Sequence, residues 1–324
     1  MKTDLSAYVP DRLRDLDNPQ TDIPALARDA EAAAAIERAA RDVPTHHHLI
    51  RGDSRRFSDV DSESVALVVT SPPYWNLKEY RNQEGQLGHI DDYEDFLSQL
   101  DRVWEECWRV LIPGGRVCIV VGDVCLSRRK HGRHRVMPLH ASIQDHCRAI
   151  GFDNLSGIYW YKISNATTES GGAGRFLGKP YEPGAVLKND VEFILMQRKP
   201  GSYRSPSIPA RILSVIEASN FQKWFRQVWT DIRGESTANH PAPFPLELAE
   251  RLIRMFSFVG DTVLDPFMGT GTTNCAASRW GRNSVGIEID PVYYDKARLR
   301  LEEANNSLFS HSKVEIEETR GAYA

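Results

Sequence analysis

From residue 46 onward, short apolar runs alternate with longer stretches whose apolar residues recur at helical spacing. Apolar runs of strand length indicate strands of a buried, largely parallel sheet, and the stretches between them indicate crossover helices. The predicted strands cover residues 48–52, 65–70, 116–121, 155–161, 191–197, 262–264 and 284–287. The predicted helices cover residues 93–111, 139–150, 246–258 and 291–303. This alternation predicts an α/β fold.

Other segments fall outside the alternation. Near the N-terminus, Ala25–Ala40 is rich in alanine and predicts one accessory helix. Prolines, serines, scattered cations and aromatic residues interrupt the pattern later in the chain and predict an insertion, whereas the C-terminal tail carries no readable pattern. The predicted organisation is an accessory segment at 1–45, one α/β domain in two halves at 46–197 and 237–305, an insertion at 198–236 and a tail at 306–324.

Composition narrows the class of protein. With 41% hydrophobic and 26% charged residues among 324, the chain is neither wholly disordered nor embedded in a membrane. Its longest apolar runs are too short to cross a bilayer, so we predict no membrane partner. The five cysteines stand singly and the N-terminus lacks the order of a secretion signal, which favours a cytoplasmic protein.

Three adjacent histidines, His46, His47 and His48, raise the question of a metal site. Adjacent residues on an extended segment point to alternate faces, and no acidic or cysteine partner stands at ligand spacing. We therefore predict no metal.

A glycine-rich turn after the predicted strand 262–264 is the first candidate for a ligand site. Asp265 and the glycines Gly269 and Gly271 stand at the carboxyl end of that strand, where α/β sheets bind ligands. No lysine follows Gly271 and no third glycine completes a dinucleotide motif, so ATP and NAD fit poorly. Glu288 ends the next strand about 20 residues later, a position from which an acid can bind ribose hydroxyls.

The second candidate follows the predicted strand 65–70 and reads Ser71-Pro72-Pro73-Tyr74. Two prolines fix the backbone and remove two N–H donors, which leaves carbonyl oxygens and the Ser71 hydroxyl as hydrogen-bond acceptors for an amino group. Tyr74 offers a flat face on which an extruded base can stack. Pro-Pro alone is equally compatible with a rigid turn.

Taken together, Ser71-Pro72-Pro73-Tyr74 and the Phe267-Met268-Gly269-Thr270-Gly271 turn resemble the signature of the DNA methyltransferases that modify amino groups. The resemblance covers roughly residues 46 to 303. It implies a Rossmann-like sheet that binds S-adenosylmethionine (SAM), with an inserted target-recognition region at 198–236. Because the catalytic motif precedes the cofactor motif, the order resembles the circularly permuted beta group.

The resemblance also implies roles for individual residues. The segment 239–246 resembles the part of the family that covers the methionine moiety of SAM. The implied catalytic residues are Ser71, Pro72, Pro73 and Tyr74. The implied cofactor-binding residues are Asp53, Phe244, Asp265, Phe267, Gly269, Gly271, Thr272 and Glu288.

The identity of the target base depends on one residue. Adenine enzymes of this family usually begin the catalytic motif with Asp, whereas Ser71 resembles the form typical of enzymes that methylate N4 of cytosine. Carbon-5 methylation requires a cysteine that follows a proline in its own family, and this chain has no Pro-Cys pair. We predict a site-specific cytosine-N4 methyltransferase; the alternatives are an N6-adenine enzyme, an RNA or small-molecule methyltransferase and a non-catalytic DNA-binding relative.

The formal net charge of −4 argues against a protein coated in nucleic acid, but this average conceals a local basic segment. This basic segment follows the predicted catalytic strands, and its positive charge predicts contacts with the phosphates of double-stranded DNA. The predicted DNA-binding residues are Arg128, Arg129, Lys130, Arg133 and Arg135. A cognate restriction endonuclease is a candidate partner, and the sequence leaves the oligomeric state open.

Overall fold

The computed structural model describes residues 3–14, 16–75, 85–162, 176–177, 183–184, 186–187, 189–234, 244–305 and 314–320. Its strands are β1 (Thr45–Arg51), β2 (Val65–Thr70), β3 (Leu111–Val121), β4 (Val124–Leu126), β5 (Arg135–Met137), β6 (Asp153–Tyr161), β7 (Phe176–Leu177), β8 (Val186–Leu187), β9 (Val191–Arg198), β10 (Val228–Trp229), β11 (Thr262–Asp265), β12 (Asn283–Glu288) and β13 (Val314–Arg320). Its α-helices are α1 (Pro19–Arg28), α2 (Ala30–Arg41), α3 (Tyr93–Val110), α4 (Arg128–His131), α5 (Leu139–Ile150), α6 (Ile208–Leu213), α7 (Ala218–Trp224), α8 (Leu246–Phe256), α9 (Thr272–Arg279) and α10 (Pro291–Asn305).

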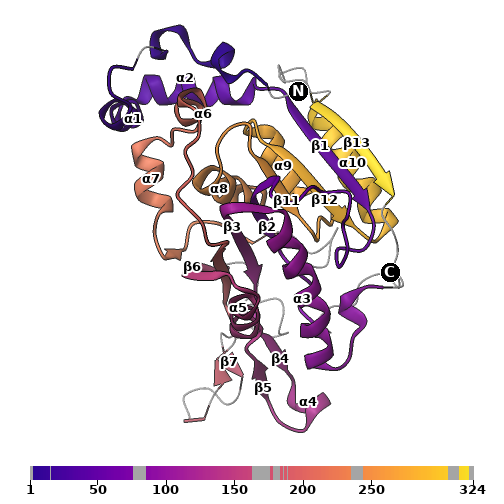
Figure 1. Ribbon diagram of the computed structural model, residues 1–324. Coiled ribbons are helices and arrows are strands. Elements are labelled where there is room, and N and C mark those ends of the chain that lie inside the picture. Colours follow the sequence, from indigo (N-terminus) through magenta and orange to yellow (C-terminus); the bar gives the residue numbers. More distant parts are fainter. Residues whose placement is uncertain are drawn as a thin grey trace.

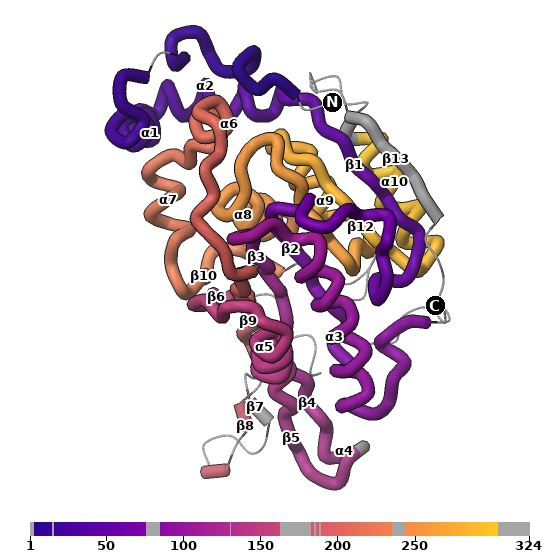
Figure 2. The backbone as a smooth tube through the Cα atoms, viewed as in Figure 1, coloured from indigo at the N-terminus to yellow at the C-terminus, as the bar shows by residue number. Residues whose placement is uncertain are grey.

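One nine-stranded sheet organises the molecule, in the order β10-β6-β9-β3-β2-β11-β12-β1-β13 (Figures 1 and 2). Every pairing in it is parallel except the two made by β9, which runs antiparallel to β3 and β6. Because the central strands are parallel, their carboxyl ends meet at one edge of the sheet. Loops at that edge are the usual place for a ligand site.

Helices cover both faces of the sheet, so the central strands are apolar on both sides. On one face, Val68 of β2 packs with α3 and α5. On the other, Leu67 and Val69 pack with α8 and α9. All six residues of β2 are buried, which explains why its sequence is a continuous apolar run and shows no alternation.

The bounds of several elements agree with the sequence-based prediction, notably β2 and α5. The single accessory helix predicted at 25–40 is wrong. The chain forms two helices that break at Asp29, whose side chain accepts hydrogen bonds from the backbone of Glu31 and Ala32 and so begins α2. The tail also contains β13, which pairs with β1 and which the sequence did not predict.

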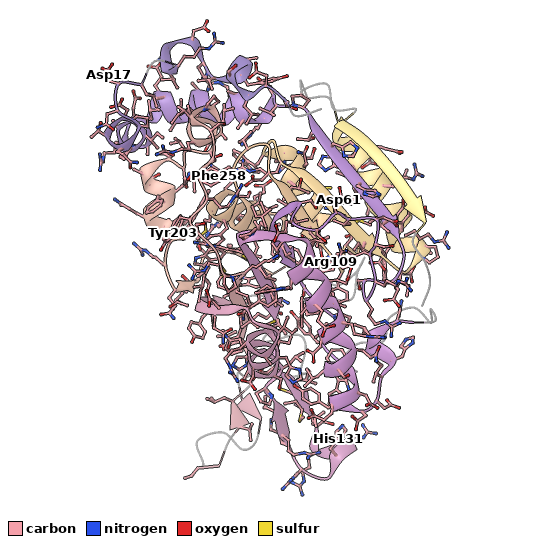
Figure 3. The ribbon with its side chains drawn as sticks, in the orientation of Figure 1. Asp17, Asp61, Arg109, His131, Tyr203 and Phe258 are labelled. Carbon is pink, nitrogen blue, oxygen red and sulfur yellow. The ribbon has the colours of Figure 1, made fainter. Side chains whose placement is uncertain are left out.

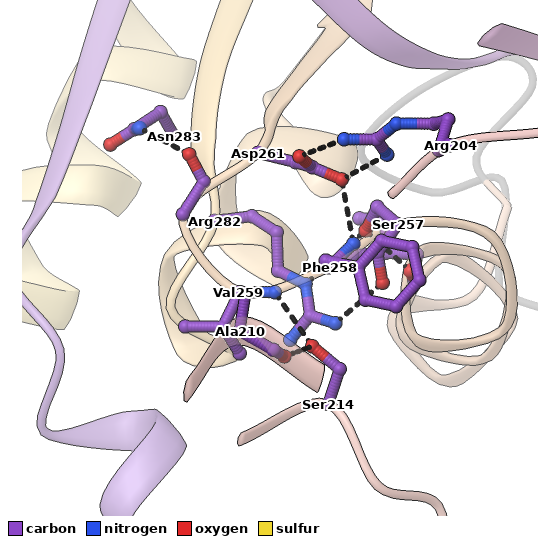
Figure 4. A network of polar contacts seen from close by, with 11 residues as sticks. Arg204, Ala210, Ser214, Ser257, Phe258, Val259, Asp261, Arg282 and Asn283 are labelled. Atoms are coloured by element: carbon purple, nitrogen blue, oxygen red, sulfur yellow. Dashed lines mark hydrogen bonds and ion pairs between the residues drawn. The ribbon is translucent and has the colours of Figure 1, made fainter. Parts of the chain in front are cut away.

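The segment 198–236, predicted as an insertion, is joined to the main sheet. It supplies β10 to the main sheet, and Trp229 of that strand is buried. Figure 4 shows how it is tied to the start of β11: Arg204 donates two hydrogen bonds of 2.6 Å to Asp261, and Ser214 Oγ accepts one from the backbone of Val259. These contacts lie at the amino-terminal edge of the central strands, opposite the predicted catalytic motif.

A small lobe extends from the other end of the molecule. It contains the β4–β5 hairpin with α4 at its tip and the short β7–β8 hairpin (Figure 1). Figure 3 places His131 of α4 at this end and Asp17 of the N-terminal segment at the opposite end. Among the described residues, none of the helices is long and apolar enough to span a membrane.

Candidate active site

The two predicted motifs meet in one cavity at the carboxyl edge of the sheet. β2 and β12 flank β11 in parallel, so the residues that follow these strands converge. Of the predicted site residues, Asp53, Ser71, Pro73, Phe267, Gly269 and Glu288 line this cavity. Residues more than 200 positions apart in the sequence therefore form a single site.

Glu288 organises the glycine turn. Its two carboxylate oxygens accept backbone hydrogen bonds, one from Gly269 and one from Asp290, each of 2.8 Å. Burial nevertheless raises the pKa of Glu288 to about 7. Because a carboxylate has about four lone pairs, Glu288 can accept two further hydrogen bonds from the hydroxyls of a ribose. This acceptor capacity fits SAM.

Asp265 lies behind the cavity and does not line it. Its carboxylate is buried and accepts hydrogen bonds from Thr70 Oγ1, at 2.7 Å, and from the backbone of Phe267, at 3.0 Å. It thereby links the end of β2 to the glycine turn. Burial raises the pKa of Asp265 to about 6. Its position indicates a structural role in joining the two motifs.

Asp53 reaches the cavity from the end of β1 and is already paired with Arg55. Arg55 also donates a 2.8 Å hydrogen bond to Gln99 of α3, and hydrogen bonding to Asp53 raises the pKa of the guanidinium. The Arg55 pair therefore fixes the Asp53 carboxylate in place. A ligand that binds Asp53 has to donate to those lone pairs of the carboxylate that do not already accept hydrogen bonds from Arg55.

The catalytic motif presents acceptors to the cavity. Ser71 and Pro73 line it, and the carbonyl of Pro72 has no hydrogen-bond donor among the described residues. Tyr74 lies behind them and is 8% exposed. Its hydroxyl lies 3.4 Å from each of three oxygens, Ser71 Oγ, Val120 O and Glu192 Oε2.

Three of the predicted cofactor residues lie elsewhere. Gly271 does not line the cavity, and a Cβ on it would lie 2.9 Å from Ala297 of α10, so helix packing excludes a side chain at this position. Thr272 begins α9, and its hydroxyl faces Arg300 at 3.4 Å. Phe244 packs into the core under α8, on the opposite face of the sheet from Phe267. Most of the segment 239–246 lies outside the described residues.

Sequence reasoning missed residues that come to the site from other elements. Gln86 and Tyr293 line the cavity, and Gln86 Oε1 is buried there without a hydrogen-bond partner among the described residues. Glu192 of β9 approaches Tyr74 and forms a 2.8 Å ion pair with Lys162. None of the three belongs to a motif. Only the folded arrangement of the chain identifies them.

The predicted DNA-binding segment forms α4 and the flanking hairpin. Arg128, Arg129, Arg133 and Arg135 are exposed and have no acidic partner among the described residues. The side chain of Lys130 lies outside the described residues. The hairpin directly follows β3, whose end abuts the site: a Cβ on Gly122 would lie 3.3 Å from the Tyr74 ring. The basic segment therefore starts beside the catalytic motif.

The histidine triplet has a structural explanation. His47 is fully buried in β1, where its ring nitrogens lie 2.7 Å from Ser284 Oγ and 2.9 Å from Thr45 Oγ1. Burial lowers the pKa of His47 to about 3. The described residues contain no cluster of three or more potential metal ligands.

Comparison with known proteins identifies the family. The model of the N6/N4 DNA methylase family matches residues 65–299, a range that includes both motifs and most of the residues that line the cavity. The chain belongs to this DNA methylase family. It is a SAM-dependent DNA methyltransferase, so its substrate is DNA and its cofactor is SAM.

Relatives of this methyltransferase cover nearly the same length. M.MjaI, a type II methyltransferase of Methanocaldococcus jannaschii, is 40% identical over 80% of this chain and 93% of its own. M.MthZI of Methanothermobacter thermautotrophicus is 36% identical over 80% of this chain and 77% of its own. Among solved structures, a candidate DNA modification methylase from Thermus thermophilus, complexed with SAM, is 49% identical with a TM-score of 0.69, over 85% of this chain and all of its own.

Proposed function

We propose that this methyltransferase transfers the methyl group of SAM to N4 of cytosine at a specific site in double-stranded DNA. The supporting observation is the cavity that Ser71 shares with Glu288 and Gly269. Ser71 lines this cavity, and the neighbouring Pro72 carbonyl accepts no hydrogen bond from the described residues, so both acceptors are available to the amino group of an extruded base. The resemblance of Ser71 to the first residue of the N4-cytosine motif favours cytosine.

The proposed roles follow from the chemistry of an exocyclic amine. Its lone pair is delocalised into the ring, so the site has to hold the two hydrogens in a geometry that makes the nitrogen nucleophilic. Ser71 Oγ and the Pro72 carbonyl accept those hydrogens, and Tyr74 supports the base. Glu288 binds the ribose of SAM, which supplies the methyl group. Catalysis is then positioning and electrostatic support for an in-line transfer, without a covalent enzyme intermediate.

The surroundings of Tyr74 restrict both its ring and its hydroxyl. Its ring is mostly covered, with Gly122 against one part of it, and its hydroxyl lies among three oxygens. We infer that the remaining exposed part of the ring contacts the base, while Glu192 and the Val120 carbonyl hold the hydroxyl. The ring then forms a rigid wall of the base pocket.

N6-adenine methylation is the second candidate. Adenine and cytosine both present an amino group, and the same two acceptors can hold either. The preference for cytosine rests on Ser71. RNA methylation and a non-catalytic role are less favoured, because the family is one of DNA methylases and the acceptors Ser71 and Glu288 both face the cavity.

We also propose a family group, a partner, a cellular location and DNA contacts for this methyltransferase. The motif order favours the permuted beta group, and the type II relatives favour a role beside a cognate restriction endonuclease in the cytoplasm. Contact with DNA phosphates is assigned to Arg128, Arg129, Lys130, Arg133 and Arg135. Sequence recognition is assigned to 198–236, a segment that is tied through Arg204 and Asp261 to the opposite edge of the sheet.

Identification of the product tests the proposal. The full chain is incubated with unmethylated duplex DNA and isotope-labelled SAM, and the DNA is digested to nucleosides for mass spectrometry. N4-methylcytosine is the expected product, and Ser71→Ala should abolish it. N6-methyladenine would contradict the choice of base, and absence of label from the DNA would contradict the proposed methyl transfer to duplex DNA.

A further inference from the structure

A second, larger cavity lies at the amino-terminal edge of the sheet. Its volume is about 670 Å³, within the range of small-molecule sites. The helices α1, α6, α7 and α8 and the start of β3 enclose it. Ala66 of β2 lines this cavity and Ser71 lines the active site, so the two are separated by about 17 Å along the strand.

The charges that line this cavity are all positive. Among the described residues, its lining contains six arginines and no acid: Arg28, Arg116, Arg198, Arg204, Arg211 and Arg254. Three of them are neutralised by acids outside the lining, since Arg198 pairs with Asp153, Arg204 with Asp261 and Arg254 with Glu37. Arg28, Arg116 and Arg211 have no acidic partner among the described residues. Arg28 is exposed, whereas Arg116 and Arg211 are partly buried, and the guanidinium of Arg116 lies over the Phe256 ring. Partly buried arginines without a carboxylate partner favour binding of an anion.

The same cavity presents aromatic faces. Phe221 and Phe225 of the α7 segment stack on each other with ring centroids 4.1 Å apart, and both remain about half exposed. Tyr203, which is 90% exposed, and Phe258 also line the cavity, and Figure 3 labels both. Exposed rings beside unpaired arginines are suited to a ligand with both a planar ring and a negative charge.

We propose that this cavity is a second ligand site, distinct from the SAM site, and that it binds a mononucleotide. The phosphate of the nucleotide pairs with Arg116 and Arg211, because guanidinium groups match phosphate oxygens in geometry and charge. The base packs against Phe221 and Phe225. A DNA duplex is too wide to enter a cavity of this volume, which favours a small ligand. The site depends on neither the identity of the target base nor the roles assigned to Ser71 and Glu288.

Calorimetry on the SAM-saturated full chain tests the proposal, with adenosine monophosphate (AMP) as the probe. Prior saturation with SAM excludes binding of AMP in the cofactor cavity. Saturable binding of AMP is expected, with weaker binding of adenosine and of inorganic phosphate alone. Absence of AMP binding to the SAM-saturated chain, or an affinity no higher than that of phosphate, would overturn the nucleotide assignment.

Variants locate the site. The double change Arg116→Gln and Arg211→Gln should weaken AMP at least tenfold, and Phe225→Leu should weaken AMP more than it weakens phosphate. Arg233→Gln, an exposed arginine that does not line the cavity, is the matched control and should leave AMP binding unchanged. If the double variant does not fold, AMP binding is measured on Phe225→Leu and on the single variant Arg211→Gln. Equal AMP affinity in the folded variants and the wild type would contradict the proposal.

Discussion

The two edges of the central sheet differ in the kind of charge they bury. At the carboxyl edge, buried acids hold the loops, with Glu288 bound to the glycine turn and Asp265 bound to the end of β2. At the amino edge, arginines hold the loops: Arg204 donates to Asp261, and Arg282 donates to the Ser257 carbonyl. Burial raises the pKa of Glu288 to about 7 and lowers the pKa of Arg282 to about 9.

This difference indicates how one sheet separates chemistry from stability. Glu288 at the carboxyl edge lines a cavity and keeps lone pairs beyond its two backbone hydrogen bonds, so a ligand can complete its hydrogen bonding. Arg282 at the amino edge donates to protein oxygens at Trp280 and Ser257 and leaves little for a ligand. We therefore expect substitutions at the first edge to change catalysis and substitutions in the second network to change folding.

Ser71→Ala should have the largest effect. Loss of one acceptor for the amino hydrogens should lower the rate constant of methyl transfer by about 100-fold or more, the size seen when one preorganised polar group is removed from an active site. Single-turnover assays with DNA measure the rate constant, and SAM binding should change less than about twofold. The exposed Ser58→Ala is the matched control. A normal rate in Ser71→Ala would contradict the catalytic assignment.

Glu288→Gln should come next. The amide keeps one acceptor oxygen, but loses the charge-assisted hydrogen bonds to the ribose, so the Kd of SAM should rise by about 10- to 100-fold. Calorimetric titration measures this change. Asp295→Asn, a substitution of an acid that does not line the cavity, should leave the Kd unchanged. If Glu288→Gln bound SAM normally, the ribose would have to be held elsewhere.

The same residue predicts a pH dependence. Because the pKa of Glu288 is raised from 4.5 to about 7, half of the chains carry a neutral Glu288 near pH 7. Ribose hydroxyls prefer the ionised form, so the Kd of SAM should fall as pH rises toward 7 and level off above it. Without SAM, the native state retains a proton that the unfolded chain has lost, so the free energy of unfolding should decrease with pH across this window. Glu288→Gln should remove the pH dependence of SAM binding and make the decrease in the free energy of unfolding smaller, because the raised pKa of Asp265, about 6, contributes a decrease of the same sign.

Asp261→Ala should have a smaller effect, on stability alone. The substitution removes both hydrogen bonds from Arg204 and one of 2.7 Å from the backbone of Phe258, so the free energy of unfolding should fall by about 2 kcal/mol. Denaturant titration measures the change. Asp145→Ala breaks an exposed ion pair with Arg148 and should have no measurable effect. A lower methyl-transfer rate in folded Asp261→Ala would argue against separate roles for the two edges.

Neutralising the basic hairpin should have the smallest effect. Changing Arg128, Arg129, Arg133 and Arg135 to Gln should weaken DNA binding by about tenfold at moderate salt and reduce the salt dependence. The Kd for duplex DNA, measured at several salt concentrations, tests this expectation. SAM binding should not change. An unaltered salt slope would show that the hairpin does not contact phosphates.

The sequence predicted the parts of the fold that local patterns determine. β2 is a continuous apolar run because it is buried on both faces, and the bounds of α5 follow from its periodicity and from Gly151, which ends it with positive φ. β13 was missed because its charged, alternating sequence becomes a strand only by pairing with β1. A strand at the edge of a sheet depends on a distant partner and not on local preference.

The site was predicted in a similar, partial way. Ser71, Gly269 and Glu288 belong to motifs and follow strands, so the topology of the sheet brings them together as expected. Gln86 and Glu192 stand outside any motif, and only folding places them near the cavity or Tyr74. Gly271 matched the motif, yet its lack of a side chain serves contact with Ala297. Spacing predicts which loop forms the site, but not the direction of each residue within it.

Hydrogen–deuterium exchange on SAM binding tests the difference between the two edges most directly. We predict slower exchange in peptides that cover 265–271 and 286–290, where Gly269 and Glu288 line the cavity, and no change across 201–225 at the opposite edge. Protection at 201–225 without protection of the glycine turn would contradict the account, because it would place the cofactor at the arginine-lined edge.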